Sequence, residues 1–475
     1  MEATNAKKTL GVFSLAMINV AAVLSIRNFP SMAVYGWSCI GWYIIGTILL
    51  LIPLSLSSAE LATGWPEGGG LYAWVKHAFG VKAGFVAIFC EWSGNLVWFP
   101  TVLSFIASTL AFAITPDLAA NHLFMFSVMM LAFWGTTVVA YFGEKASTRF
   151  SNGGVILGGI IPAVILIFFA IVWISSGRAI ELPPFSVSEI RILPEMSMST
   201  LPFFSTVILL FAGMEMAGFH ALETKNPQRD FPRAMFFSAL VIFLLTVLGT
   251  LAVAFVIPEQ ELNLTSGVVQ AIQYFFDAAN VSWLNKPMAL LITIGGVVLL
   301  AAWLIGPAKG LGVVAEEGNM PSFFNRMNKY GAPVPVLVTQ AVIGSIISLL
   351  YVFLPSVNQV YWILSAMTVE LLCIIYGLVF LSVIKLRYSH PDTPRSFKIP
   401  GGKPGVWVVG GLGSFGVIFT FIIGILPPEL GIRHTWAYVF AVLIGTFVLA
   451  VPPLIFLIMK KPEWRQQQKP AGSTA

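Results

Sequence analysis

Long stretches of apolar residues recur along this chain, and short polar segments separate them. A helix needs about 20 mostly apolar residues to cross the hydrocarbon core of a bilayer. The pattern therefore predicts twelve membrane-spanning helices, near residues 10–35, 38–60, 83–113, 122–143, 153–176, 200–222, 234–257, 288–308, 334–354, 359–385, 405–426 and 435–459. A further short helix is expected outside the membrane, around Val268 to Asp277, between the seventh and eighth runs.

The composition agrees with a membrane protein. Of the 475 residues, 57% are hydrophobic and only 10% are charged, with a mean hydropathy of +0.87, whereas a soluble domain carries about 25% charge. No small-residue cleavage site follows the first apolar run, so this run is expected to stay as the first helix. Cys39, Cys90 and Cys373 all lie within apolar runs, which predicts small buried side chains, with no disulfide and no metal site.

Basic residues gather in alternate loops. If the N-terminus is cytoplasmic, 21 of the 26 lysines and arginines fall in cytoplasmic segments, four fall outside, and Arg27 lies within a helix. Lysine and arginine are enriched in cytoplasmic loops, so both termini are predicted to be cytoplasmic.

The first and sixth apolar runs look interrupted. In the first, small and β-branched residues from Ala21 to Ser25 precede a charge and a proline; in the sixth, Gly213 and Gly218 flank Glu215. Unwound backbone at membrane depth persists only where it lines a cavity or is buried in protein. Its free N–H and C=O groups can hold the carboxylate and amine of an amino acid. The alternative, that the glycines only allow close helix packing, is left open by their spacing.

Four stretches carry a resemblance to a known family: residues 59–80 (AELATGWPEGGGLYAWVKHAFG), 213–235 (GMEMAGFHALETKNPQRDFPRAM), 261–270 (ELNLTSGVVQ) and 303–336 (WLIGPAKGLGVVAEEGNMPSFFNRMNKYGAPVPV). They resemble the amino acid–polyamine–organocation superfamily, and within it the bacterial glutamate/γ-aminobutyrate antiporter branch. The likeness extends over nearly the whole chain, in order and with similar spacing.

This resemblance implies an all-α polytopic fold with about twelve transmembrane helices, built as an inverted 5+5 repeat (LeuT-like) plus two C-terminal helices. The implied segments are the first repeat at 1–176, an external loop at 177–199, the second repeat at 200–385, a cytoplasmic loop at 386–404, helices 11 and 12 at 405–461, and a polar cytoplasmic tail at 462–475. Because the chain ends soon after its last helix, we expect no C-terminal plug of the kind that the branch carries.

The resemblance also implies a substrate site between broken helices 1 and 6. The matching positions are Val23, Leu24 and Ser25 in helix 1, Phe211, Ala212 and Gly213 in helix 6, Trp303, and the Trp92 and Asn95 of a W-x-G-N stretch. Trp98 and Ser365 are expected to complete the side-chain pocket. Many relatives have a glycine-rich G-S-G where this chain has Val23-Leu24-Ser25, so the shape of this cradle is expected to differ.

Charges within membrane helices are costly and call for a partner or a function. Arg27 and Glu370 lie at similar depths, roughly 13 and 16 Å below the outer ends of their helices. We predict an ion pair between them, acting either as an outer gate or as a static structural pair. Glu91 is a candidate proton or cation site, and Glu215 is expected to cap the broken sixth helix.

Other polar residues are given structural roles. His220 is interpreted as a satisfied buried group. Glu60, Glu223 and Asp230 are expected to form salt bridges or caps near the inner face with Lys225, Arg229 and Arg233.

The sequence therefore predicts a secondary active amino-acid transporter of the bacterial inner membrane. It is expected to exchange glutamate- or γ-aminobutyrate-like amino acids by alternating access. Proton-coupled uptake of neutral or cationic amino acids or polyamines is the alternative, and a transport-dead sensor is a third. The expected partners are an amino acid or its decarboxylation product, the lipid bilayer and, as a further candidate, protons. No enzyme motif is present in the sequence, and neither a cofactor nor nucleic acid is expected.

Overall fold

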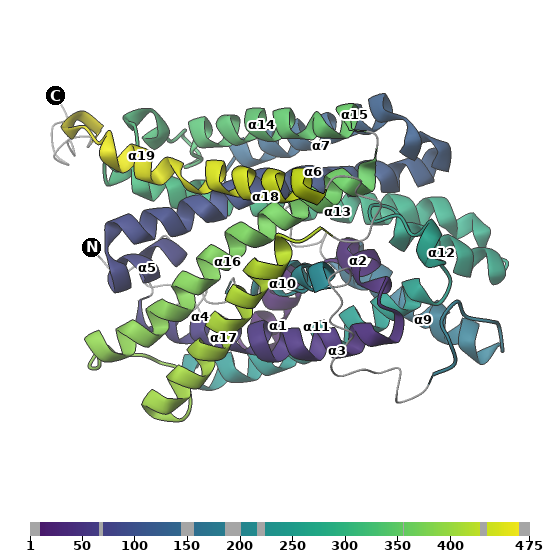
Figure 1. Cartoon of the computed structure of the whole chain (residues 1–475), viewed down its shortest axis with the longest axis horizontal. Coiled ribbons are helices and arrows are strands. Elements are labelled where there is room, and N and C mark those ends of the chain that lie inside the picture. The colour runs from purple at the N-terminus through teal and green to yellow at the C-terminus, as the bar shows by residue number, and fades with distance from the viewer. Residues whose placement is uncertain are drawn as a thin grey trace.

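The chain forms a bundle of long helices in the computed structural model (Figure 1). The structure describes residues 10–65, 70–143, 156–185, 201–215, 224–354, 356–427 and 435–464. Apart from a single bridge between Leu10 and Thr224, these ranges consist of helices and the loops that connect them. Several predicted features lie outside the described residues: Gly218, His220, Glu223, most of the external loop at 177–199 and most of the tail at 462–475.

Each of the twelve predicted spans has a helical counterpart. In chain order these are α1 (Val12–Val23) with α2 (Phe29–Ala33), α3 (Cys39–Gly46) with α4 (Ile52–Gly64), α6 (Val81–Ile114), α7 (His122–Tyr141), α9 (Ile161–Ser175), α10 (Ser205–Phe211), α11 (Pro227–Ala254), α13 (Asn285–Glu316), α14 (Val334–Ser348) with α15 (Leu350–Phe353), α16 (Val357–Ser389), α17 (Gly402–Gly424), and α18 (Thr435–Ala450) with α19 (Pro452–Ile458). Within the described ranges, ten helices are long and apolar enough to cross a membrane. The first and sixth spans fall short of that length because each is broken.

Two shorter helices lie between the spans. The predicted external helix is confirmed as α12 (Gly267–Ala278). Helix α5 (Leu71–Phe79) was not predicted. It packs against α6 and α16, and its Lys76 and Tyr72 contact Glu317 at the end of α13.

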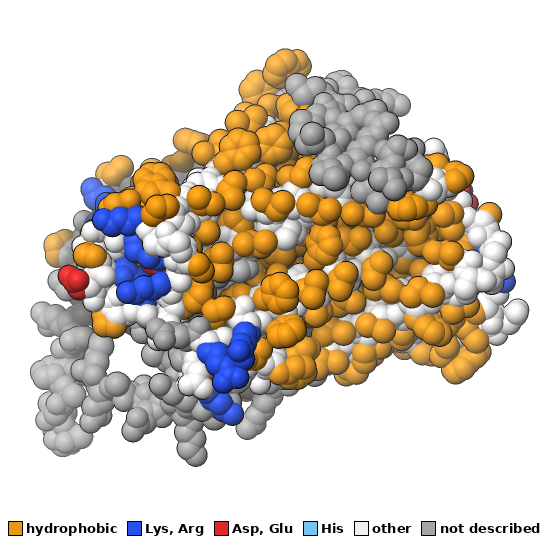
Figure 2. All heavy atoms as spheres, turned by 90° about the horizontal axis from the view of Figure 1, so that it is seen from below, with side chains coloured by type: hydrophobic (Ala, Val, Ile, Leu, Met, Phe, Trp, Pro, Cys, Tyr) orange, Lys and Arg blue, Asp and Glu red, His pale blue; other side chains and the backbone are white. Residues whose placement is uncertain are grey.

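The surface has the character of a protein that sits in lipid. Large apolar side chains such as Leu131, Phe236 and Phe447 are about two-thirds exposed or more. Figure 2 shows this apolar surface covering most of one face, with lysine and arginine gathered at one end. Water would not tolerate such a surface, so a bilayer must cover it. We call the end that carries α5 and the last turns of α13 and α16 the basic end, and the other the far end.

The centre of the bundle is formed by α6, α13 and α16, with α6 packing along both of the other two. The short helix α10 lies against α16 and α17, while α1 packs on α11. This arrangement brings both broken spans next to the central helices. The boundaries of the two five-helix repeats stay a prediction.

Candidate substrate-binding site

The first span breaks where the sequence predicts. Helix α1 ends at Val23, and Leu24 (φ −67°, ψ 108°) and Ser25 (φ −126°, ψ 100°) are extended. A 3-10 turn then begins at Ile26 and leads into α2. The bulky residues in place of a glycine-rich segment therefore still allow the helix to unwind.

The sixth span breaks in the same way. Helix α10 ends at Phe211, Ala212 is extended (φ −67°, ψ 141°), and Gly213 has φ 107°. Residues other than glycine rarely adopt such a positive φ, so the glycine fixes the position of the break.

Glu215 caps this break. Its Oε2 accepts a hydrogen bond of 3.1 Å from the backbone N–H of Gly213, and its Oε1 accepts one of 3.3 Å from the hydroxyl of Tyr376 on α16. Because the break leaves the Gly213 N–H without an intrahelical partner, the carboxylate takes the role of a capping side chain. The predicted cap is therefore present.

Replacing Glu215 tests the capping role. Glutamine keeps an oxygen that can accept from Gly213 N–H, so Glu215→Gln should retain most of the stability. Glu215→Ala leaves two buried donors without an acceptor and should cost about 1–3 kcal/mol. Melting temperatures of the two purified variants provide the measurement. Equal losses in both would show that the charge, rather than the cap, is what matters.

Both breaks open onto one cavity. Its walls come from α6, α13 and α16, from the first residue of α5 and from the broken first and sixth spans. They are formed by Val23, Ser25, Arg27, Asn28, Leu71, Glu91, Gly94, Asn95, Trp98, Leu209, Ala212, Glu215, Leu299, Trp303, Thr368, Leu372, Ile375 and Tyr376. The space for centres of water-sized molecules is about 50 Å³, equivalent to a few waters at about 10–15 Å³ each. The cavity in this conformation therefore has room for only a few water-sized groups.

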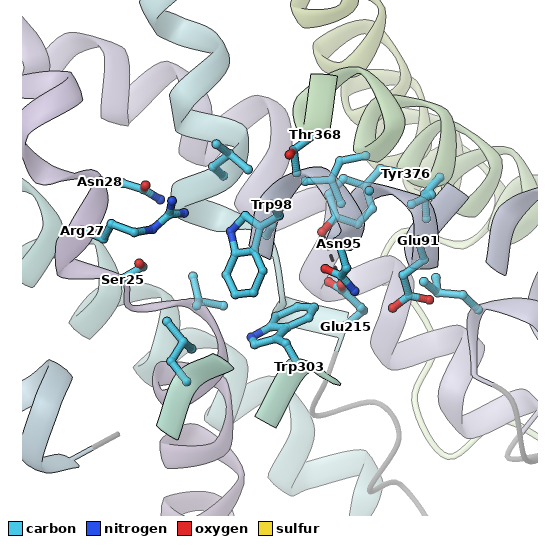
Figure 3. A pocket seen from close by; sticks show the side chains of 18 residues that line it. Ser25, Arg27, Asn28, Glu91, Asn95, Trp98, Glu215, Trp303, Thr368 and Tyr376 are labelled. Carbon is cyan, nitrogen blue, oxygen red and sulfur yellow. Dashed lines mark hydrogen bonds between the residues drawn. The ribbon is translucent and has the colours of Figure 1, made fainter. Parts of the chain in front are cut away.

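Charged groups lie at two separate ends of this cavity (Figure 3). Arg27 lies at the first end with Ser25 and Asn28 beside it. Glu91 and Glu215 lie at the second end. Trp98 and Trp303 stand between the two ends, with ring centroids 5.7 Å apart. The cavity thus has a guanidinium group at one end and two carboxyl groups at the other, on either side of an aromatic wall.

Arg27 is held by two of the central helices, α6 and α16. It is 2% exposed and donates a hydrogen bond of 2.6 Å to the hydroxyl of Thr101. Its guanidinium carbon lies 5.6 Å from the ring centroids of both Trp98 and Tyr361, within the range of a cation–π interaction. Aromatic faces and a hydroxyl therefore compensate this buried charge.

The predicted Arg27–Glu370 ion pair is wrong for this conformation. Both carboxylate oxygens of Glu370 lack a hydrogen-bond partner in the part of the chain that the structure describes. The two residues lie at similar depths along their helices, but Glu370 lies on the side of α16 that faces Gly424 of α17. Thr368 and Leu372, which line the cavity, are each two positions from Glu370, about 200° around the helix.

Three of the residues predicted at the two helix breaks do not line the cavity. Phe211 is fully buried with its ring 6.1 Å from that of Tyr43, Leu24 faces a separate narrow hollow beside Gly158, and the backbone N–H of Gly213 donates to Glu215. The predicted lining residues that the structure does place in the wall are Val23, Ser25, Asn95, Trp98, Ala212 and Trp303.

Helix α16 contributes wall residues that sequence reasoning missed. Thr368, Leu372, Ile375 and Tyr376 recur at helical spacing along one face of it. Ser365 was predicted and is absent from the wall, and Trp92 points away, donating to Gln340 of α14 at 3.0 Å. The spacing was visible in the sequence, but it did not reveal which face of α16 meets the cavity.

Near the basic end, Glu60 forms the predicted kind of salt bridge, but with other partners. Its carboxylate binds Arg387 at the end of α16 and Arg395 in the following loop, where the Arg395 Nε lies 3.4 Å from Oε1. Asp230 accepts from the N–H of Asn226 at 3.2 Å and so caps the start of α11. Both groups therefore act as structural ties.

A profile of the amino acid permease family matches residues 10–449 of this chain. The chain belongs to this family. An uncharacterised transporter of Legionella pneumophila is 40% identical to this permease over 460 residues, which cover 95% of the permease and 97% of the relative. A glutamate/γ-aminobutyrate antiporter of Lactococcus lactis is 30% identical over 457 residues, which cover 94% and 90% of the two chains.

A solved structure has the same fold. The structure of MhsT in complex with L-phenylalanine superimposes with a TM-score of 0.60 at 14% identity, covering 88% of the permease and 99% of the other chain. The predicted LeuT-like fold is thereby confirmed. Together with the family, it identifies this permease as a polytopic amino-acid transporter.

Proposed function

We propose that this permease is an antiporter that exchanges amino acids by alternating access, with the substrate held at the two helix breaks. The observation that carries the proposal is that both breaks open onto one small cavity in the centre of the bundle. Helix breaks at matching positions of two repeats are the expected place for a transporter's substrate.

The breaks offer groups that suit an amino acid. The end of α1 presents backbone C=O groups, and the turn that begins at Ile26 presents N–H groups. The partial charges at these helix ends would attract the ammonium and the carboxylate of a zwitterion. Recognition of this kind needs no charged side chain and leaves the walls free to select the rest of the substrate.

The charges at the two ends of the cavity favour a substrate with separated charges. Arg27 would face a carboxylate, and Glu91 would face an ammonium group, across the wall formed by Trp98 and Trp303. Glutamate and γ-aminobutyrate, which the named Lactococcus relatives exchange, carry charged groups separated in this way. The second candidate is a cationic amino acid or polyamine taken up with protons, and the presence of Glu91 in the wall favours it.

The basic end is proposed to face the cytoplasm of a bacterium, with the protein in the inner membrane and both termini inside. The support is the strong excess of lysine and arginine that this orientation places in cytoplasmic segments.

The test is counterflow in proteoliposomes. Vesicles are loaded with unlabelled glutamate, γ-aminobutyrate, lysine or putrescine, and uptake of labelled glutamate or γ-aminobutyrate is measured. Uptake should occur only into vesicles whose lumen holds a compound that the protein exchanges. Arg27→Ala should lose most of this exchange, because the carboxylate end of the cavity loses its cation.

Two results would contradict the proposal. Uptake that proceeds equally into empty vesicles would exclude obligatory exchange. No exchange with any amino acid or its decarboxylation product, in protein that is folded by thermal melting, would indicate a sensor instead.

A further inference from the structure

Glu370 is a buried carboxyl group that the substrate cavity does not use. It is 1% exposed, and neither of its carboxylate oxygens has a hydrogen-bond partner among the residues described. It lies over Gly424 of α17, where a methyl group added to the glycine would come within 2.5 Å of Oε1. Ser205, at the start of α10, borders the same spot. The carboxyl group therefore sits where α10, α16 and α17 meet.

This place is separate from the substrate cavity. Thr368, Leu372, Ile375 and Tyr376 line the cavity from one face of α16, and Glu370 lies on the opposite face. The body of α16 therefore stands between Glu370 and any substrate, so Glu370 does not select the substrate by contact.

The surroundings of Glu370 hold no compensating cation in the described part of the chain. From α10 it faces Ser205, and from α17 it faces Gly424, neither of which titrates. The titratable groups that interact with it are Cys373 on its own helix and Tyr438 on α18. An ionised carboxylate without a partner is strongly disfavoured inside a membrane protein. Among the described residues nothing compensates an ionised Glu370, so its environment in this conformation favours the neutral acid.

We propose that Glu370 is a proton-binding site, distinct from the substrate cavity, that loads and releases one proton during the transport cycle. The proton moves from the carboxyl oxygen to water, and the carboxylate that remains accepts a proton from water in the next cycle. Helix α10 is the first half of the broken sixth span and packs on both α16 and α17. A movement of α10 during alternating access, which is part of the proposed function, changes the contacts around Glu370 directly.

The test measures substrate and proton movement together in proteoliposomes. Labelled substrate reports exchange, and a pH-sensitive dye in the lumen reports protons. Glutamine has nearly the same shape as a neutral glutamic acid but cannot release a proton. Glu370→Gln should therefore keep exchange and lose the substrate-linked proton signal, together with the dependence of rate on pH.

Glu261→Gln is the matched control, since this glutamate is exposed at the far end of the molecule, and it should keep both signals. A Glu370→Gln variant that exchanges substrate and still moves protons like the wild type would overturn the proposal, as would wild-type exchange with no proton signal. Both of these outcomes leave the proposed exchange function standing.

A second measurement needs no variant and no transport. Dicyclohexylcarbodiimide reacts with protonated carboxyl groups in apolar surroundings, and peptide mass spectrometry locates the adduct. Wild-type protein should carry the adduct on Glu370 at both acidic and neutral pH. Glu370 that remains unmodified at acidic pH, in folded protein whose other carboxyl groups react, would overturn the proposal even if no substrate had been found.

Discussion

Gly158→Ala should remove most transport activity and strongly destabilise the protein. A Cβ added to Gly158 would lie 1.9 Å from the Cα of Gly295, and one added to Gly295 would lie 2.1 Å from the Cα of Gly158. The obstacle on both sides is backbone, which cannot rotate away as a side chain can. Gly158 lies in a short π-helix, Ile156–Ile160, and this π-helix would have to move away from α13. Overpacking of this kind costs about 1–3 kcal/mol or more.

The effect should reach the substrate site because of where this contact lies. Gly158 and Gly295 border a narrow hollow together with Leu24, Ser25 and Arg27 from the break in the first span. Separating α13 from the fifth span would shift the support behind this break. We therefore expect the exchange rate to fall further than the melting temperature alone would suggest.

The neighbouring glycine provides a control. A methyl group on Gly159 would have the carbonyl oxygen of Leu24, 3.9 Å away, as its nearest neighbour, which is ordinary contact. Gly159→Ala should therefore stay within about 0.5 kcal/mol of the wild type. Equal behaviour of the two variants, in thermal melting and in exchange, would show that the close approach of the two backbones does not matter.

The sequence allowed the spans and the breaks to be predicted because both depend on local chemistry. Hydropathy alone located twelve helical segments, and it worked even for the broken spans, whose two halves are apolar like the rest. The break in the sixth span was visible because Gly213 allows a positive φ and Glu215 can cap the free N–H.

The contacts between helices could not be predicted in the same way. The depth of Arg27 and Glu370 along their helices suggested a pair, but depth is one coordinate, and the rotation of α16 decides which residues meet. The partner of Arg27 turned out to be aromatic and hydroxyl groups instead of a carboxylate. Helix α5 was missed because it is only nine residues long, too short for periodicity to distinguish it from a loop.

The second large effect concerns Glu60, which ties the end of α4 to the end of α16 and the loop after it. Glu60 and the side chain of Arg395 are each 1% exposed, and that of Arg387 is 11% exposed. Glu60 also accepts a hydrogen bond of 2.8 Å from the backbone N–H of Ile399. Burial lowers the pKa of the Arg395 guanidinium, and Glu60 acts against that shift. Among the residues that the structure describes, Glu60 is thus the only carboxylate within ion-pair distance of both guanidinium groups.

Glu60→Ala should therefore destabilise the protein by about 3–5 kcal/mol, because it leaves two arginines near each other with no compensating carboxylate. Thermal melting in detergent measures the loss. Lys76→Ala is the matched control: Lys76 pairs with Glu317 at the basic end at 2.7 Å, both side chains are about one-third exposed, and Glu317 keeps its hydrogen bond from Tyr72. Water can replace much of that interaction, so its loss should cost about 1 kcal/mol or less. If the two variants have the same melting temperature, burial does not set the strength of the interactions of Glu60 with Arg387 and Arg395. The link between α4 and α16 then contributes no more to stability than a surface ion pair.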